Sequence, residues 1–353
     1  MMGINVSLMV ESIDENQGLL EIKDLVVVCD LSEGVEGVKD ILRHIYRFQP
    51  VPIHDLARAV QIPVPVVASF RRELEKRKYA ERKSGIVLTE RGVALLNSLG
   101  ISTRIPGRAF EVKYTSNDYI DRLVPEIEAL VAGRPAPDVT LDQSHATVAT
   151  IVRRASYIYE RDGLEGKDLF FLGDDDLTSL SVLRFADEFG IKLGSTTVVD
   201  VDQRILSYIQ NTSEEMGWDV ETVYHDLKDP LPDEFTHTFD VFISDPPYTL
   251  EGISLFALRG VQSLKLCEGK KGIICFSRRK PVDSRLLYAN LNLMGLVPEE
   301  LLPSFNKYVG AQIHAGTSSL LLCVSAGSSD SNLDIDMSRI YTASGKRKRF
   351  YEV

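Results

Sequence analysis

The chain has 353 residues, of which 44% are hydrophobic, and it carries a formal net charge of −11 with a sequence pI of about 5.2. This length ordinarily holds two domains, and the acidic balance argues against a dedicated nucleic-acid-binding protein. Residues 36–104 differ, with 13 lysines and arginines against 7 aspartates and glutamates, so the remainder carries a net charge of −17. An acidic portion of this kind suits a cationic substrate.

The four cysteines show no close paired spacing, and three lie in apolar runs, where we expect buried, reduced thiols. No His and Cys cluster has the spacing of metal ligands, so we predict no metal site. The start of the chain lacks a signal-peptide pattern, and no apolar run reaches membrane-spanning length. We therefore expect a soluble, cytoplasmic protein.

After an extension over residues 1–35, with little beyond a strand at Asp24–Val28, residues 36–104 predict a small domain. Its pattern is three helices, a β-hairpin at Tyr79–Leu88 and a last helix capped by Thr89, which is typical of a winged helix (α+β). Basic residues cluster on its third helix: Arg71, Arg72, Lys76, Arg77 and Lys78. They fit DNA binding, or a fold reused for dimerisation or substrate gating. In an acidic, enzyme-like chain we favour the second interpretation.

We assign residues 105–140 to a connector that contains one helix, Tyr119–Val131. A further helix is predicted to open at Leu141 and to continue to Tyr159, with His145 near its start as a structural histidine rather than a catalytic base. Residues 141–325 form the predicted catalytic domain, and residues 326–353 a flexible basic tail.

Three apolar runs in the catalytic domain each end on carboxylates, and helix-like segments separate them. The runs deliver Gly173-Asp174-Asp175-Asp176, then Asp200 and Asp202, and finally Asp245-Pro246-Pro247-Tyr248. This pattern predicts an α/β fold with a Rossmann-like, mostly parallel sheet. Ligands bind outside the carboxyl ends of the strands of such sheets, so the acids are expected to converge on one cleft.

Gly173 allows a tight turn and a close approach of a nucleotide-like ligand directly after the first strand. The Gly-x-Gly-x-x-Gly pattern is absent, and Asp174, Asp175 and Asp176 would repel a pyrophosphate, whereas they would attract a cationic or sulfonium ligand. The alternative, an acidic helix N-terminus, explains one aspartate better than three.

Asp200 is placed to accept hydrogen bonds from ribose hydroxyls, and Asp202 is a less certain partner. Asp226 follows a third strand at Trp218–Tyr224 and could accept a hydrogen bond from an adenine amino group. The alternative for each is a helix cap, but their repeated position at strand ends favours binding.

Asp245-Pro246-Pro247-Tyr248 is the most specific motif in the chain. The prolines remove two N–H donors, so the backbone carbonyls, together with the Asp245 carboxylate, can only accept hydrogen bonds from an amine. Tyr248 can offer a ring face to a cation or a flat base. The alternative is a simple proline turn.

These residues carry a resemblance to class I S-adenosylmethionine-dependent transferases, in which Asp-Pro-Pro-Tyr is similar to the motif that holds an exocyclic amino group in amino-methyltransferases. The combination with Gly-Asp-Asp-Asp resembles the branched-chain polyamine synthases, or N4-bis(aminopropyl)spermidine synthases, over residues 36–325. Gln143, in Asp142-Gln143 with Ala146-Thr147, and the pair Arg153-Arg154 are similar to this family's lead-in to the first strand.

The resemblance implies two successive aminopropyl transfers from decarboxylated S-adenosylmethionine to the internal amine of spermidine, through N4-aminopropylspermidine, with release of 5′-methylthioadenosine and no permanent cofactor. We assign Asp176 as the principal acid at the attacking nitrogen, with Asp245, Pro246 and Tyr248 as partners. We expect the other side chains to bind the acceptor (Asp174, Asp175, Pro247) or the donor (Gln143, Gly173, Asp175, Asp200, Asp202, Asp226, Asp245).

Two other classes are retained: an amino-methyltransferase acting on nucleic acid or protein, and a transcription regulator that senses a nucleoside or polyamine. The acidic cleft opposes a phosphate-bearing substrate. We expect a homodimer that binds neither nucleic acid nor membrane.

Overall fold

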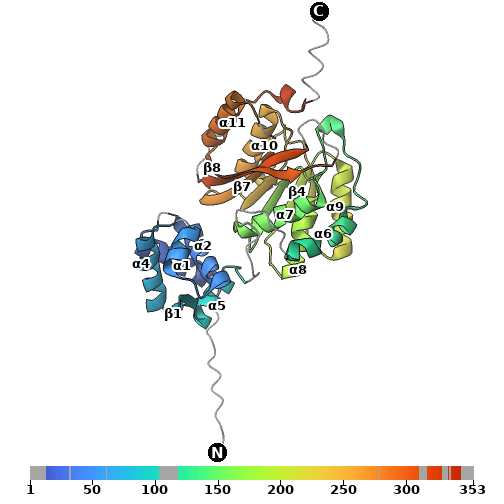
Figure 1. The fold of residues 1–353 in the computed structure, drawn as a ribbon. Helices are drawn as coiled ribbons and strands as arrows, with labels where there is room; N and C mark the ends of the chain where they lie inside the picture. The colour runs from blue at the N-terminus through green and yellow to red at the C-terminus, as the bar shows by residue number, and fades with distance from the viewer. Residues whose placement is uncertain are drawn as a thin grey trace, which may run out of the picture. The chain divides into compact units, whose positions relative to one another are not determined.

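The computed structural model describes residues 13–31, 33–60, 62–102, 118–277, 279–309, 316–327, 333 and 335–342. The chain forms two compact units, Met1–Gly107 and Arg108–Val353, which Figure 1 colours from blue to cyan and from green to red.

The first unit consists of helices around one small core, with a two-stranded hairpin. Its elements are α1 (Glu15–Cys29), α2 (Gly34–Phe48), α3 (Ile53–Val60), α4 (Val64–Lys76), β1 (Ala80–Arg82), β2 (Ile86–Leu88) and α5 (Glu90–Ser98). The apolar residues of α2 recur at helical spacing and are buried. The Thr89 hydroxyl caps α5 by accepting the Gly92 N–H at 3.2 Å, as predicted.

The strand predicted at Asp24–Val28 is wrong, because this segment belongs to α1. The β-branched run Val26–Val28 suggested a strand, but the buried positions of the helix are Gly18, Ile22, Leu25 and Cys29, which follow the 3.6-residue period. Val27 is 77% exposed. The apolar residues of α1 join the same core as those of α2, so this helix is part of the first unit rather than an extension.

The second unit is built on a seven-stranded sheet with the order β5-β4-β3-β6-β7-β9-β8. The strands are β3 (Leu169–Leu172), β4 (Thr196–Asp200), β5 (Glu221–Tyr224), β6 (Val241–Ser244), β7 (Glu268–Phe276), β8 (Leu296–Lys307) and β9 (Thr317–Ala326). The first five in this order run parallel, whereas β9 is antiparallel to both β7 and β8. The predicted α/β fold with a mostly parallel sheet is confirmed.

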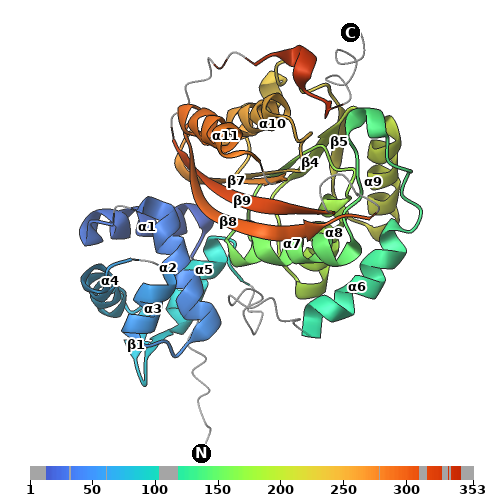
Figure 2. The same cartoon turned by 45° about the horizontal axis from the view of Figure 1, so that its top comes forward.

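Helices cover both faces of this sheet. Helices α7 (Val148–Glu160) and α8 (Thr178–Phe189) lie on one face, and α10 (Leu250–Ser263) and α11 (Pro281–Leu293) lie on the other (Figure 2). The remaining helical elements are α6 (Asp118–Val131), α9 (Gln203–Met216) and the 3₁₀ turns η1 (Val139–Leu141), η2 (Asp233–Phe235) and η3 (Met337–Arg339).

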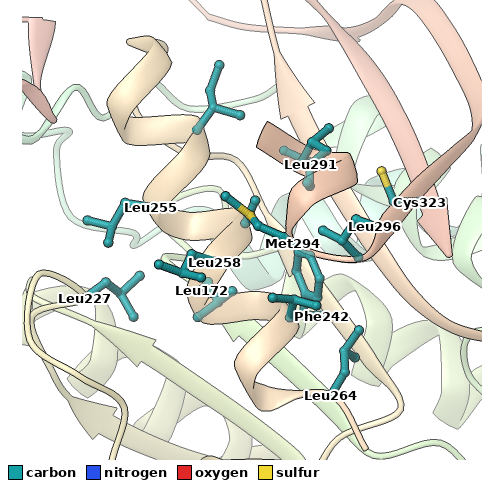
Figure 3. Packing of buried hydrophobic residues seen from close by; sticks show 14 of the residues in the cluster. Leu172, Leu227, Phe242, Leu255, Leu258, Leu264, Leu291, Met294, Leu296 and Cys323 are labelled. Carbon is teal, nitrogen blue, oxygen red and sulfur yellow. The ribbon is translucent and has the colours of Figure 1, made fainter. Parts of the chain in front are cut away.

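The core between the sheet and α10 is closely packed around Phe242 of β6 (Figure 3). A Cβ atom at Gly260 of α10 or at Gly272 of β7 would lie within 2.6 Å of the Phe242 ring, so both positions require glycine for close packing. This packing fixes β6, and therefore the residues that follow it, relative to the neighbouring strands.

Helix α7 begins at Val148 and not at the predicted Leu141. Residues 142–147 do not form helical hydrogen bonds, because the backbone N–H groups of Ser144 and Ala146 are donated to the side chains of Asp175 and Asp176. The segment before α7 is therefore hydrogen-bonded to the aspartates that follow β3.

The prediction of a flexible tail from residue 326 does not hold for residues 335–342. Ile335 and Ile340 are buried in the core of the second unit. The Thr249 hydroxyl donates to the Ile340 carbonyl at 2.6 Å, and the Thr342 N–H donates to Asp142 at 2.7 Å. The basic segment at residues 345–349 lies outside the described residues.

Candidate active site

Three neighbouring strands of the sheet end at the same edge. β3 is followed by Gly173, β4 ends with Asp200, and β6 is followed by Asp245. Gly173 has φ +69°, and a Cβ atom there would lie 3.4 Å from Phe256, so glycine meets both a conformational and a steric need. The sheet therefore brings the predicted strand-end residues together.

A pocket opens beside β4 at this edge. Its lining includes three predicted donor-site residues, and the full set is Gly173, Val199, Asp200, Val201, His225, Asp226, Leu227, Lys228, Leu255, Phe256, Ile340 and Tyr341. The Asp200 carboxylate is 7% exposed and accepts the backbone N–H groups of Asp174 and Asp202 at 3.0 and 2.8 Å. Burial raises its pKa.

Two other predicted donor-site residues lie beside this pocket instead of lining it. Asp202 caps α9 by accepting the Arg204 N–H at 3.0 Å, and it also accepts the Gln143 side-chain amide at 3.2 Å. Hydrogen bonds from Arg204 lower the pKa of Asp202. The pair Gln143–Asp202 thus joins the segment before α7 to the end of β4.

The sequence did not predict the part of the pocket that residues 335–342 supply. Tyr341 lines it, and the Lys228 ammonium lies 5.1 Å from the centre of the Tyr341 ring. Burial and the charges of Asp226 and Asp200 raise the pKa of Tyr341 to about 12. Ile340 and Tyr341 follow the last strand as an isolated pair, so they show neither helical nor strand periodicity. Their apolar character was the only feature of the sequence that indicated burial.

The three consecutive aspartates have three different surroundings. Asp174 is 3% exposed, and its two oxygens accept the N–H groups of Thr178 and Ser179 at 2.8 and 3.0 Å, which caps the start of α8. Burial nevertheless raises its pKa to about 7. Asp174 therefore occupies the position that the sequence offered as the alternative to ligand binding, an acid at a helix N-terminus.

Asp176 is 2% exposed, and both of its oxygens are engaged. One accepts the N–H of Ala146, and the other accepts Nη1 of Arg154 at 2.7 Å. Burial raises the pKa of Asp176 to about 6, against the opposing effect of Arg154.

Asp175 is partly exposed, and one of its oxygens accepts the Ser144 N–H at 3.1 Å. Within the described residues its other oxygen accepts no hydrogen bond. Burial and the neighbouring charges of Asp176 and Asp245 raise its pKa well above the usual value. Of the three aspartates, Asp175 is therefore the one with an oxygen that remains able to bind a ligand.

Arg154 of α7 links the two acidic motifs. Its guanidinium is 2% exposed and donates to Asp176 and to Asp245 at 2.7 Å each. Asp176 is buried and Asp245 is part-buried, and a shared cation stabilises both carboxylates, since burial disfavours the charged form. From the sequence, Arg154 was named only as part of a family resemblance. Its ion pairs could not be predicted, because Asp176 lies 22 positions and Asp245 lies 91 positions further along the chain.

The Asp-Pro-Pro-Tyr motif, which follows β6, contains a hydrogen bond between its first and last residues. The Tyr248 hydroxyl donates to Asp245 Oδ1 at 2.8 Å, and Pro246 and Pro247 are buried. Tyr308, which follows β8, donates to Asp245 Oδ2 at 2.6 Å and was missed by sequence reasoning. Asp245 is thus held by three donors from three parts of the chain.

His145 lies between the two residues that bind Asp175 and Asp176, but its ring has a separate environment. Burial and Arg134 lower the pKa of His145 to about 4, and within the described residues its buried Nε2 atom has no hydrogen-bond partner. This geometry is consistent with the prediction that His145 is a structural histidine rather than a catalytic base.

In the part of the chain that the structure describes, no group of three His, Cys, Asp or Glu side chains is arranged to hold a metal ion. Over the same residues, no helix combines the length and the apolar character needed to cross a membrane. Cys29, Cys275 and Cys323 are buried free thiols, and Cys267 is exposed.

The mostly parallel sheet, with helices on both faces and a pocket at the carboxyl ends of its strands, has the fold of class I S-adenosylmethionine-dependent transferases. A family model described as the branched-chain polyamine synthase A C-terminal domain matches residues 122–353. The chain belongs to the branched-chain polyamine synthase family.

Two relatives show how far the similarity extends. An uncharacterized protein of Methanocaldococcus jannaschii is 36% identical over 334 residues, which cover 89% of this chain and 79% of the relative. The N(4)-bis(aminopropyl)spermidine synthase of Thermococcus kodakarensis is 33% identical over 260 residues, which cover 70% and 71%.

A solved structure shares the fold. It is the branched-chain polyamine synthase of Thermus thermophilus in complex with N4-aminopropylspermidine and 5′-methylthioadenosine, with a TM-score of 0.53 and 21% identity over 88% of this chain and 92% of that one.

The buried Arg154 generates a stability prediction. Arg154→Met should lower the free energy of unfolding by about 3–5 kcal/mol at pH 8, because the buried Asp176 carboxylate loses the cation that it shares with Asp245. The loss should be smaller at pH 5.5, where carboxylates without a cation take up protons. Urea denaturation at the two pH values measures both.

The matched control is Arg259→Met. Arg259 is equally hidden, at 6% exposed, but its guanidinium donates to the carbonyl oxygens of Leu227 and Lys228 and to Gln262. The free energy of unfolding that Arg259→Met loses should be the same at pH 5.5 and at pH 8. An Arg154→Met loss that is equally independent of pH would contradict the assigned role.

Proposed function

We propose that this protein transfers aminopropyl groups from decarboxylated S-adenosylmethionine to the internal secondary amine of spermidine. Two transfers give N4-aminopropylspermidine and then N4-bis(aminopropyl)spermidine, with one 5′-methylthioadenosine released each time. The observation that carries this proposal is that a pocket lined by Gly173, Asp200 and Asp226 lies at the same edge of the sheet as the carboxylates Asp175, Asp176 and Asp245.

The donor occupies the pocket beside β4. Asp200 binds the ribose hydroxyls, Asp226 accepts a hydrogen bond from the adenine amino group, and Gly173 allows the sulfonium end of the donor to approach β3. Phe256 and Tyr341 add aromatic surface for the base. Gln143 and Asp202 hold this wall of the pocket in place.

The acidic motif favours the decarboxylated donor over S-adenosylmethionine itself. The carboxylate of S-adenosylmethionine would face Asp175 and Asp245, and like charges at this range in a partly buried site repel by several kcal/mol. The decarboxylated donor brings only cations, the sulfonium and a terminal ammonium, which these carboxylates attract.

The carboxylate that contacts the acceptor is best assigned to Asp175 together with Asp245. Sequence reasoning placed Asp176 in that role, but both of its oxygens already accept hydrogen bonds, so it acts through Arg154. Asp174 caps α8 with both of its oxygens and is 3% exposed, so we assign it a structural role and not the binding of a flanking ammonium. The Pro246 carbonyl, which follows β6, adds an acceptor for the amine proton.

The reaction follows from these positions. An acceptor ammonium gives its proton to a carboxylate, and the freed lone pair attacks the methylene beside the sulfonium. The carbon–sulfur bond breaks with its electron pair going to sulfur, so the positive charge moves from sulfur to nitrogen. The tertiary ammonium loses a proton before the second transfer, and the quaternary product keeps its charge, which the acidic cleft stabilises.

We infer that the first unit is a winged helix that does not bind nucleic acid. Three basic residues of its α4 region are paired with acids: Arg71 with Glu75 at 3.4 Å, Lys76 with Glu73 at 3.3 Å, and Arg77 with Asp24 at 2.6 Å. Such pairing lowers the charge available to phosphates. The boundaries at residues 104 and 140, the homodimer and the cytoplasmic location stay predictions.

Mass spectrometry of reaction products tests the proposal. Purified protein with spermidine and decarboxylated S-adenosylmethionine should add one and then two aminopropyl units, whereas ordinary S-adenosylmethionine should give no product. Methyl additions in the second reaction would instead support the alternative, an amino-methyltransferase.

Asp226 provides a test of the donor site. Its side chain is 38% exposed, so Asp226→Ala should leave the fold intact. It should weaken the binding of 5′-methylthioadenosine by about 1 kcal/mol, or roughly fivefold in Kd, through loss of one hydrogen bond. The control is Asp229→Ala, an exposed aspartate that does not line the pocket. Equal affinities of the two variants in calorimetric titrations would refute the assignment.

A further inference from the structure

A chain of hydrogen bonds from the ends of β8 and β9 reaches the Asp-Pro-Pro-Tyr motif. Arg154 Nε donates to Asn306 Oδ1 at 2.9 Å, and Asn306 Nδ2 donates to Ser318 Oγ at 2.8 Å. Ser318 Oγ lies 2.8 Å from the Tyr308 hydroxyl, which donates to Asp245 Oδ2 at 2.6 Å. Asn306 is fully buried and Ser318 is 2% exposed, so these bonds are shielded from water.

The chemistry of the groups sets the direction of this chain. A guanidinium only donates, so Asn306 must present its oxygen to Arg154 and its amide N–H to Ser318. Ser318 then has its own proton to donate to Tyr308. A carboxylate only accepts, so the Tyr308 proton points to Asp245. Arg154 Nη2 donates to the same Asp245 oxygen at 2.7 Å and also, at 3.2 Å, to the Tyr308 oxygen, and so closes the ring.

The two oxygens of Asp245 differ as a result. Oδ2 receives two fixed donors, Arg154 and Tyr308, whereas Oδ1 receives only the Tyr248 hydroxyl among the described residues. The Tyr248 oxygen also lies 2.7 Å from the Tyr308 oxygen. The Tyr248 proton therefore has two acceptors within reach, Asp245 Oδ1 and Tyr308.

We propose that Tyr308 is a positioning residue for aminopropyl transfer, held by Ser318 and Asn306. It holds Oδ2 of Asp245 in a fixed position through its hydrogen bond, and it offers Tyr248 an alternative acceptor. When the acceptor ammonium gives its proton to Oδ1, the Tyr248 hydroxyl turns toward Tyr308, and the nitrogen keeps the electron pair with which it attacks the donor. This inference rests on the proposed function.

The experiment compares Tyr308→Phe, Ser318→Ala and the double variant in steady-state assays with spermidine and decarboxylated S-adenosylmethionine. Tyr308→Phe should lower kcat about tenfold or more, and Ser318→Ala should lower it by a smaller factor. The double variant should be no slower than Tyr308→Phe, because Ser318 acts through Tyr308. The affinity for 5′-methylthioadenosine should stay at the wild-type value in all three, since neither residue lines the donor pocket.

The matched control is Tyr208→Phe, which also removes one part-buried hydroxyl contact, the bond to the Leu130 carbonyl at 2.7 Å, and should leave kcat unchanged. A wild-type kcat in Tyr308→Phe would overturn the inference, as would losses that multiply in the double variant. If Tyr308→Phe does not fold, Ser318→Ala alone decides: a lower kcat with unchanged 5′-methylthioadenosine affinity supports the inference, and an unchanged kcat overturns it. A wild-type protein that makes no aminopropylated product refutes the proposed function itself.

Discussion

The arrangement of the active site depends on one buried cation. Arg154 is held by Asp176, Asp245 and Asn306, and so connects the loop after β3, the motif after β6 and the end of β8. Without it, the buried Asp176 carboxylate would lie near Asp245 without a compensating cation, at a cost of several kcal/mol. The arginine neutralises part of the acidic cluster and leaves Asp175 and one oxygen of Asp245 for a ligand. The site is thus acidic enough to attract cations, yet stable when empty.

This division explains how one short acidic run serves several purposes. Asp174 caps the start of α8, Asp176 accepts a hydrogen bond from Arg154, and Asp175 is partly exposed and accepts the Ser144 N–H. Their raised pKa values have a common first cause, burial. Because a polyamine brings positive charge, its binding favours the ionised forms that burial disfavours. The free energy of substrate binding therefore compensates for the desolvation of these groups.

The sequence predicted the parallel sheet and the convergence of Gly173, Asp200, Asp226 and Asp245, because each of these residues follows a short apolar run and the sheet topology then dictates their common edge. It did not predict contributions that depend on long-range contacts. Arg154, Tyr308 and Tyr341 reach the site from α7, from the end of β8 and from beyond β9, and no local pattern marks them. Long-range packing also explains the strand that was wrongly predicted within α1. A run of valines has strong strand propensity, but the burial of every third or fourth residue stabilises a helix.

The central claim, that buried aspartates with raised proton affinity receive the ammonium groups of a polyamine, is tested most directly by calorimetry of spermidine binding to the 5′-methylthioadenosine complex at pH 6.5. Titrations in two buffers with different ionisation enthalpies give the number of protons exchanged. We predict net proton release, because a bound cation lowers the pKa of carboxyls whose pKa burial had raised. The release should diminish in Asp175→Asn. Binding with no proton release, or with proton uptake, would contradict the account.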